Sequence, residues 1–378
     1  MNIHSNVSKL ALGKNPFPEN DWHEILNQVS AKSKAKEKLP EWFSTSGIYY
    51  PKRISVEQSS SEKTAKYKAG LVSGNLLVDL TGGMGVDDYY FSKSVKSVVH
   101  CEIDCGLSEI TVNNFRALSA SNINCICGDS FEILKEYDHA DWIYVDPSRR
   151  SETKGKVFML KDCLPDVPGN LKFYFSKTER ILVKTSPILD IAAGISELEN
   201  IKAIHIVAVK NEVKELLWEL WKGYSGSIQM KTININSDES EDTFDFTLND
   251  QHTANYAFPL QYLYEPNAAI MKSGGFEEVG AVFPIFKLHK HSHLYTSDRI
   301  ILFPGRVFRI DEVVSYNKAG LKILSGMGKA NITVRNFPET VEQLRKKLRI
   351  SDGGDRFCFF TTDKDDNKIA LICTKITT

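Results

Sequence analysis

Short apolar runs alternate with helical stretches along the chain from residue 75 to about residue 209. Strands separated by helices are typical of βαβ units, whose strands form a parallel sheet. Two later runs, SIQMKTINI and TFDFTL, flank the acidic segment SDESED and predict a hairpin, and a helix is expected before them over 213–221. We therefore expect an α/β sheet of about seven strands that closes with this hairpin. The predicted parallel strands are LLVDL (76–80), SVVHCE (97–102), INCICG (123–128), WIYVDP (142–147), RILVKTS (180–186) and AIHIVAV (203–209).

The regions on either side of this pattern differ from it. Residues 1 to about 70 favour helices, because Trp22, Ile25, Leu26 and Val29 share one helix face, and Pro40 is expected to end that helix. A second helix is predicted over about 60–71, with Ser59 or Ser60 as its N-cap. Beyond about residue 255 the pattern becomes a mixture of short strands and helices, typical of small α+β domains.

Length and composition narrow the class of protein. A chain of 378 residues suggests two or three domains, and 42% hydrophobic with 25% charged residues is an ordinary globular mixture. No window approaches the ~18 consecutive apolar residues of a membrane span, so we expect a cytoplasmic protein without membrane contact.

Cysteine and histidine spacing gives little support for cross-links or metal. The seven cysteines form no CxxC pair, so neither a disulfide framework nor structural zinc is expected. We expect Cys101, Cys105, Cys125 and Cys127 to be small core residues. His289, His291 and His293 alternate, as on one strand face, but no carboxylate or cysteine accompanies them at ligand spacing, so no metal site is predicted.

The charge is unevenly distributed. The whole chain has a net charge of -1, yet residues 287–349 carry thirteen Lys and Arg against five Asp and Glu, a local net charge of +8. Such a region can meet a polyanion, although many of these side chains could be solvated faces of ordinary elements. The candidates for phosphate contacts are Lys290, Arg306, Arg335, Arg345, Lys346 and Arg349.

A glycine-rich turn follows the first predicted parallel strand. That strand ends at Asp79, and Thr81, Gly82, Gly83 and Gly85 follow it. Glycines let the backbone approach a ligand, and the next helix directs its N-terminus toward it. The acidic residue before the glycines suits the ammonium of an amino acid better than a pyrophosphate. The turn therefore points to S-adenosylmethionine rather than a dinucleotide.

Three more acidic residues end successive predicted strands, where ligands of open α/β sheets bind. Glu102 is placed to accept the ribose hydroxyls of the cofactor, and Asp129 suits the amine of its adenine. Asp146 ends the fourth strand, where the methyl group should face the acceptor.

Several motifs together resemble a known family. DLTGGMGVDDYYFS, VDPSRR, LVKTSP, EQSSSEKTAKYKAG and the tail FPGRVF...NFPETVEQLRKKLRISDGGDRF are similar to a bacterial family of class I, Rossmann-like, S-adenosylmethionine-dependent methyltransferases. That family carries a ferredoxin-like domain and a C-terminal THUMP-like domain. The resemblance implies an N-terminal helical region (1–72), a methyltransferase domain (73–252), a ferredoxin-like domain (253–305) and a THUMP-like, RNA-binding domain (306–378). It also implies cofactor binding by the glycine turn, Asp79, Glu102 and Asp129, and RNA (rRNA or tRNA) as substrate.

The segment SSSEKTAKYKAG is also similar to the one before the first strand in RNA cap guanine-N2 methyltransferases. This similarity implies that Ser60 and Thr64 supply hydroxyls near the cofactor carboxylate. The alternative is an ordinary capped helix that packs on the sheet.

The motif DPSRR bears on the acceptor. Asp146 and Pro147 match the core of the motif with which methyltransferases hold a base amine, but the aromatic residue of that motif is missing. Arg149 and Arg150 are expected to grip phosphate beside the site. Methylation of uracil C5 needs a cysteine after the fifth strand, and LVKTSPILD has none. A base in RNA is therefore the favoured acceptor.

Two alternatives stay open. Ribose 2′-O-methyltransferases use lysine, aspartate, lysine and glutamate, and Asp146, Lys184 and Glu212 resemble three of them, with Lys66 or Lys68 as the fourth. In that chemistry a lysine with a lowered pKa takes the hydroxyl proton. A small-molecule methyltransferase is the second alternative, and it would not need the basic region.

Overall fold

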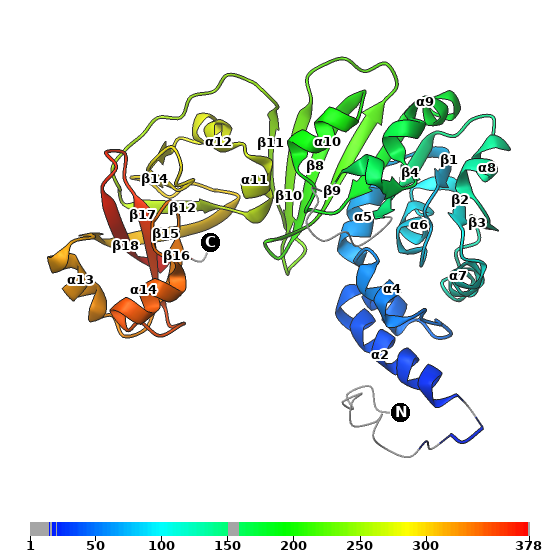
Figure 1. The fold of residues 1–378 in the computed structure, drawn as a ribbon, viewed down its shortest axis with the longest axis horizontal. Coiled ribbons are helices and arrows are strands. Elements are labelled where there is room, and N and C mark those ends of the chain that lie inside the picture. The colour runs from blue at the N-terminus through cyan, green and yellow to red at the C-terminus, as the bar shows by residue number, and fades with distance from the viewer. Residues whose placement is uncertain (1–14, 16, 20, 150–158, 377–378) are drawn as a thin grey trace. The chain divides into compact units, whose positions relative to one another are not determined.

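The computed structural model describes residues 15, 17–19, 21–149 and 159–376, and these divide into two compact units (Figure 1). The first unit comprises residues 1–204 and 214–226, and the second comprises residues 205–213 and 227–378. Two of the three boundaries between the units fall within strands β8 (Ile201–Val209) and β9 (Glu212–Trp221), and the third follows β9.

The larger sheet has the strand order β11-β10-β8-β9-β7-β4-β1-β2-β3. The pairs of β1 with β2, β2 with β3, β1 with β4 and β4 with β7 are parallel, as the alternating pattern predicts. In a parallel sheet the carboxyl ends of the strands lie at one edge, so the acidic strand ends come together there. These strands are β1 (Gly74–Asp79), β2 (Val95–Glu102), β3 (Ile123–Cys127), β4 (Trp142–Val145) and β7 (Arg180–Thr185).

The predicted helix over 213–221 is wrong, because this segment is strand β9 and pairs antiparallel with β7. Leu216, Leu217, Trp218 and Leu220 are all buried. A continuous apolar run fits a buried helix or a buried strand equally well, so only the pairing decides. This extra strand is one reason why the sheet has nine strands rather than about seven.

Helices of the first unit are mostly short and begin at polar caps. The helix that begins at Trp22 ends at Lys38, and Pro40 opens the next helix, where its missing N–H costs nothing. The N-cap of α5 is Ser61, not Ser59 or Ser60, and it forms a capping box with Thr64. The helices are α2 (Trp22–Lys38), α3 (Pro40–Ser44), α4 (Arg53–Gln58), α5 (Glu62–Leu71), α6 (Val86–Phe91), α7 (Cys105–Ala117), α8 (Ser130–Lys135), α9 (Val167–Lys177) and α10 (Ile191–Glu197), with a 3-10 turn η1 (Leu160–Asp162). A small ribbon pairs β5 (Ser148–Arg149) with β6 (Cys163–Leu164).

In the second unit, β10 (Gln229–Ile235) and β11 (Glu241–Thr247) form the predicted antiparallel hairpin. A separate sheet has the order β13-β14-β12-β15-β18-β17-β16. One core cluster contains Phe308, Phe359 and Leu371, and another contains Leu344, Phe360 and Ala370. The remaining elements are β12 (Tyr262–Pro266), α11 (Ala268–Ser273), α12 (Phe276–Val282), β13 (Phe286–Lys287), β14 (Tyr295–Ser297), β15 (Gly305–Ser315), α13 (Lys318–Ser325), β16 (Asn331–Val334), α14 (Val341–Leu348), β17 (Arg356–Thr362) and β18 (Lys368–Lys375).

Two expectations about cysteines and histidines need correction. Cys105 and Cys127 are exposed and joined by a disulfide, whereas Cys101 is buried and free. The start of α7 and the end of β3 bring the two sulfurs together across 22 residues of sequence. The segment with the three alternating histidines lies between β13 and β14 and is not a strand, so the histidines do not share a strand face.

Candidate functional site

The glycine-rich turn connects β1 to α6. Asp79 is buried, and its Oδ1 accepts hydrogen bonds from the Thr81 amide (2.7 Å) and the Thr81 hydroxyl (3.1 Å). Gly83 and Gly85 have positive φ, which an L side chain rarely adopts, and Gly85 starts α6. A side chain at Gly82 would overlap the ring of His100. The glycines are therefore required by the local backbone and packing as well as by any ligand.

Burial shapes the electrostatics around Asp79. Burial and the nearby Asp88 raise the pKa of Asp79 well above its usual range. Asp88 is also fully buried, and its Oδ2 lies 2.5 Å from Nδ1 of His100. A cation bound beside these two carboxyl groups would lower their pKa values and be held by them.

Glu102 closes the other side of the turn. Its Oε2 accepts the Gly83 amide and its Oε1 accepts the Asp104 amide, both at 2.8 Å. Each carboxylate oxygen keeps a further lone pair for a ligand hydroxyl. The next residue, Ile103, is 77% exposed, although it is large and apolar. The sequence analysis did not include Ile103 among the candidate cofactor-binding residues. Its position directly after the acidic strand end at Glu102 could have indicated it.

Asp129 lies at the end of the third parallel strand, as predicted, but it also has a structural task. It is the exposed N-cap of α8, and its Oδ1 accepts the Phe131 amide at 2.8 Å. The same carboxylate has further lone pairs, so capping leaves it able to accept a ligand amine.

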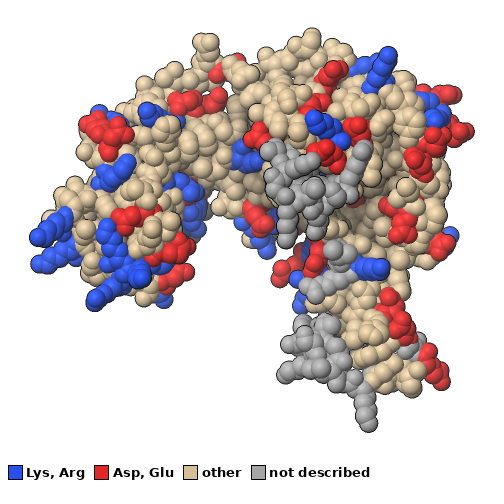
Figure 2. Space-filling view, in the orientation of Figure 1, with Lys and Arg blue, Asp and Glu red and all other residues tan. Residues whose placement is uncertain are grey.

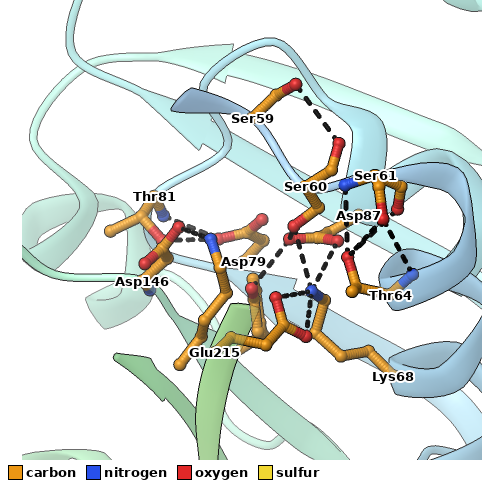
Figure 3. Close-up of polar contacts among 12 residues, drawn as sticks. Ser59, Ser60, Ser61, Thr64, Lys68, Asp79, Thr81, Asp87, Asp146 and Glu215 are labelled. Atoms are coloured by element: carbon orange, nitrogen blue, oxygen red, sulfur yellow. Dashed lines mark hydrogen bonds and ion pairs between the residues drawn. The ribbon is translucent and has the colours of Figure 1, made fainter. Parts of the chain in front are cut away.

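Asp146 and Lys184 form an ion pair at the ends of β4 and β7. Thr81 links this pair to the glycine turn, because its hydroxyl accepts the Asp146 amide at 2.7 Å while it donates to Asp79 (Figure 3). Burial lowers the pKa of Lys184, but Asp146, Asp87 and Glu215 outweigh burial, so that its pKa lies above the ordinary value. The protein without ligands therefore holds Lys184 as an ammonium, not as the lysine with lowered pKa that ribose methylation was expected to need.

A second charged cluster lies beside this pair (Figure 3). The fully buried Nζ of Lys68 donates to both carboxylate oxygens of Glu215 at 2.8 Å and lies 3.2 Å from Oδ1 of Asp87. Asp87 Oδ2 also accepts the hydroxyls of Ser60 and Tyr144, each at 2.8 Å. Burial raises the pKa of Asp87, but Lys68 and Lys184 outweigh it and lower that pKa. We call these residues, Lys68, Asp87 and Glu215, the buried cluster.

The structure discriminates among the predicted polar residues. Lys68 belongs to the buried cluster, whereas Lys66 is half exposed and pairs with Glu62 at 2.7 Å. Glu215 belongs to it as well, whereas Glu212 is exposed at the start of β9. The apolar run VKELLWELW contains two glutamates, Glu215 and Glu219, and the run by itself does not show which of them meets Lys68.

The other predicted site residues are placed as follows. The hydroxyl of Ser60 is used within the cluster, because it accepts Lys68 Nζ at 2.9 Å and donates to Asp87. The hydroxyl of Thr64 serves the capping box of α5. Pro147 is buried, the backbone of Arg149 lies in β5, and Arg150 lies outside the described residues.

The six residues predicted to contact RNA phosphates fall into two groups. Arg306 and Arg335 both bind the buried carboxylate of Glu265, and Arg345 pairs with Asp352. Lys290, Lys346 and Arg349 are exposed, and among the described residues no ion pair engages their side chains. Figure 2 shows Lys and Arg side chains gathered over α13 and α14, which contain or adjoin two of these three.

Within the part of the chain that the structure describes, no group of three His, Cys, Asp or Glu side chains is arranged to hold a metal ion. None of the described helices is long and apolar enough to cross a membrane.

The order of the parallel strands and the turn after β1 define a class I methyltransferase fold. The chain is similar, at 30% identity and a TM-score of 0.90, to the "putative methyltransferase from Porphyromonas gingivalis W83", with 100% of this chain and 96% of that chain covered. The chain belongs to the same family, a class I methyltransferase family with ferredoxin-like and THUMP-like domains, which confirms the resemblance. Family matches place a ferredoxin-like domain at residues 262–304 and a THUMP domain-like region at residues 305–375.

More distant likenesses are confined to part of the chain. A putative RNA methyltransferase from Pyrococcus horikoshii shares 17% identity, with 41% of this chain and 74% of that chain covered and a TM-score of 0.27. TrmK of M. capricolum with S-adenosyl-homocysteine shares 16% identity, with 43% of this chain and 68% of that chain covered and a TM-score of 0.33. Among curated proteins, none matches the chain.

Proposed function

We propose that the protein is an S-adenosylmethionine-dependent methyltransferase that acts on RNA. The observation that carries this proposal is the arrangement of Asp79, the glycine turn and Glu102 at the carboxyl ends of β1 and β2. The turn lies between two carboxylates, one that is buried and one whose two oxygens each accept a single backbone amide and keep a further lone pair. Such a site suits a ligand with an ammonium at one end and ribose hydroxyls at the other.

The residues along this edge of the sheet match the successive parts of the cofactor in the same order. Asp79 would hold its ammonium, Glu102 its ribose hydroxyls, and Ile103 and Asp129 its adenine. When bound there, S-adenosylmethionine supplies a methyl group on a sulfonium sulfur. Asp146 and Lys184 lie on the far side of Asp79 from Glu102 along the strand order, so they would face the acceptor.

RNA as substrate is supported by the second unit. The THUMP-like region includes α13 and α14, over which basic side chains gather. Lys346 and Arg349 are exposed there and available to phosphates. For the acceptor atom, Asp146 with Pro147 matches the sequence motif for a base amine, whereas the ion pair with Lys184 supports a hydroxyl.

Calorimetry with S-adenosylmethionine and methylation of total RNA test the proposal together. Asp79→Ala and Glu102→Ala should each weaken cofactor binding, by about 1.5–3 kcal/mol for a lost charged hydrogen bond. Glu109→Ala is the matched control, since Glu109 is exposed on α7. Unchanged affinity in folded Asp79 and Glu102 variants would contradict the cofactor site, and cofactor binding without methyl transfer to RNA would contradict the substrate.

A further inference from the structure

We propose that the acceptor at this site is the 2′-hydroxyl of an RNA ribose, held by Asp146 and Lys184, with Lys68 and Glu215 as positioning residues. This inference rests on the proposed function, and it names the acceptor that the geometry at Asp146 selects. The observation behind it is that the carboxylate at the end of β4 is already bound to an ammonium.

A base amine is a poor match for this ion pair. The amine needs oxygen acceptors for its N–H groups, and its nitrogen gains positive charge as it is methylated. The Asp146 carboxylate is partly occupied by Lys184, and the pKa of Lys184 is raised, so a positive charge stands beside the reacting atom. Like charges at this distance oppose the reaction. No aromatic residue follows Pro147 to stack on a base, since Ser148 stands there.

A hydroxyl matches the same pair in both of its hydrogen-bonding roles. Its oxygen can accept a hydrogen bond from Lys184 Nζ while its O–H donates to the Asp146 carboxylate. Asp146 is the more exposed partner, at 37% against 12% for Lys184, so the carboxylate is accessible from outside. An acceptor could therefore bind without breaking the ion pair.

The transfer balances with S-adenosylmethionine as the methyl donor and these two residues. A lone pair of the hydroxyl oxygen forms the O–C bond to the methyl carbon, and the C–S bond breaks with its electron pair left on sulfur. The O–H proton passes to the Asp146 carboxylate while the O–C bond forms, so the oxygen does not build up positive charge beside Lys184. The Lys184 ammonium stabilises the oxygen while the proton leaves, so no lysine with a lowered pKa is required.

The buried cluster holds Lys184 in position. In the antiparallel pair of β7 and β9, Lys184 stands opposite Leu217, and Glu215 lies two residues along β9 on the same face. Glu215 and Asp87 both act on the charge of Lys184. Lys68 pairs with both of these carboxylates and fixes Glu215 through both of its oxygens. The four residues Lys68, Asp146, Lys184 and Glu215 thus act as one unit.

RNA offers a single alcohol inside its chain. The 3′ and 5′ oxygens of an internal nucleotide are esterified to phosphate, so that only the ribose 2′-hydroxyl is free, and it both donates and accepts hydrogen bonds. A hydroxyl-directed site on an RNA enzyme therefore selects the ribose.

Alkaline hydrolysis of the labelled product tests this acceptor directly. The protein is incubated with S-adenosylmethionine tritiated in its methyl group and with total RNA from a strain that lacks the gene. Hydrolysis needs a free 2′-hydroxyl, so ribose methylation should leave the label in alkali-resistant dinucleotides. Label in mononucleotides would overturn the inference and leave the proposed function intact. Absence of label from all RNA would instead contradict the proposed function.

Two catalytic variants add a kinetic test. Lys184→Met and Asp146→Asn should each lower turnover by at least ~10²-fold, the usual loss for an acid–base group, while cofactor affinity measured by calorimetry is kept. Lys66→Met and Glu212→Gln are matched controls with expected wild-type turnover. Full turnover in a folded Lys184→Met protein would overturn the proposed role of the pair.

Glu215 requires a measurement that separates positioning from stability. Glu215→Gln should lower kcat with little change in the KM for RNA. Glu215→Asp, which keeps the carboxylate, should have a kcat between those of Glu215→Gln and the wild type. A loss confined to thermal stability, with normal kcat below the melting temperature, would overturn the positioning role. The position of the label needs no variant, so it remains decisive even if a substitution in the buried cluster prevents folding.

Discussion

Two clusters built around buried carboxylates, one in each unit, look alike in chemistry and differ in position. In the first unit, Lys68 pairs with Glu215 and Asp87 beside the carboxyl ends of the parallel strands. In the second, Arg306 and Arg335 neutralise Glu265, where Glu265 on β12 lies opposite Arg306 on β15 in the sheet register. The first cluster adjoins an exposed carboxylate and a glycine turn, and the second joins strands within a sheet. Buried carboxylates with basic partners therefore occur both beside the proposed site and within a sheet, so they do not mark a site by themselves.

The comparison also changes how the basic region is interpreted. Arg306, Arg335 and Arg345 contribute to its net charge of +8 but bind carboxylates of their own unit. Charge counted along the sequence therefore overstates how many of these basic side chains could contact a phosphate. Lys290, Lys346 and Arg349 are the predicted contacts that remain exposed without a described ion pair.

The largest expected effect in this comparison is Lys68→Met. It would leave the carboxylates of Glu215 and Asp87 buried with no direct cation, which costs about 3–5 kcal/mol of unfolding free energy. Chemical denaturation monitored by circular dichroism measures this loss. Lys66→Met, on the same helix but half exposed, should change stability by less than about 0.5 kcal/mol. Equal free energies of unfolding for the two variants would mean that the ion pairs of the buried cluster do not stabilise the fold.

The corresponding change in the second unit should be smaller and should spare the first unit. Replacing Arg306 and Arg335 together by Leu leaves Glu265 uncompensated, but both arginines are about one-third exposed, so water reaches them. We expect a loss of about 2–3 kcal/mol by denaturation, with unchanged S-adenosylmethionine affinity by calorimetry. Weaker cofactor binding in this double variant would show that the two clusters are not independent.

Salt dependence distinguishes the exposed basic residues from the paired ones. Each lost phosphate contact should reduce the slope of log affinity for single-stranded RNA against log salt by about 0.7. Lys346→Ala and Arg349→Ala should show this reduction, whereas Arg345→Ala, which breaks the pair with Asp352, should leave the slope nearly unchanged. Filter binding at several salt concentrations gives the slopes, and identical slopes in all three variants would remove Lys346 and Arg349 from the RNA surface.

Lys38 in α2 should make the stability of the first unit depend on pH. Burial and the charge of Lys184 lower the pKa of Lys38 to about 8, from an unfolded value near 10.5. The unfolded chain then binds more protons between these values, so stability should rise from pH 8 to pH 10.5. Lys38→Met removes this pH-dependent gain in stability. The denaturation midpoint of the wild-type protein should therefore rise relative to that of the variant between pH 8 and pH 10.5. A difference that is constant with pH would contradict the lowered pKa.

Local patterns in the sequence were sufficient for the parallel strands, the hairpin, the glycine turn and the acidic strand ends. Asp79 and Glu102 follow short apolar runs, and the carboxyl ends of parallel strands share one edge of the sheet. That the two residues lie close together could therefore be inferred from the sequence. The resemblance added the C-terminal domains, which composition alone could not identify.

Tertiary structure decided which lysine and which glutamate join the buried cluster. Lys66 and Lys68 lie two residues apart on one helix, as Glu212 and Glu215 lie three apart in one segment, and nothing local ranks them. The choice depends on β9 being a strand rather than a helix, because the pairing with β7 turns Glu215 inward and leaves Glu212 exposed. Lys68 then meets Glu215 across 147 residues of sequence. A contact of that range depends on the packing of whole elements, which periodicity in a short window does not contain.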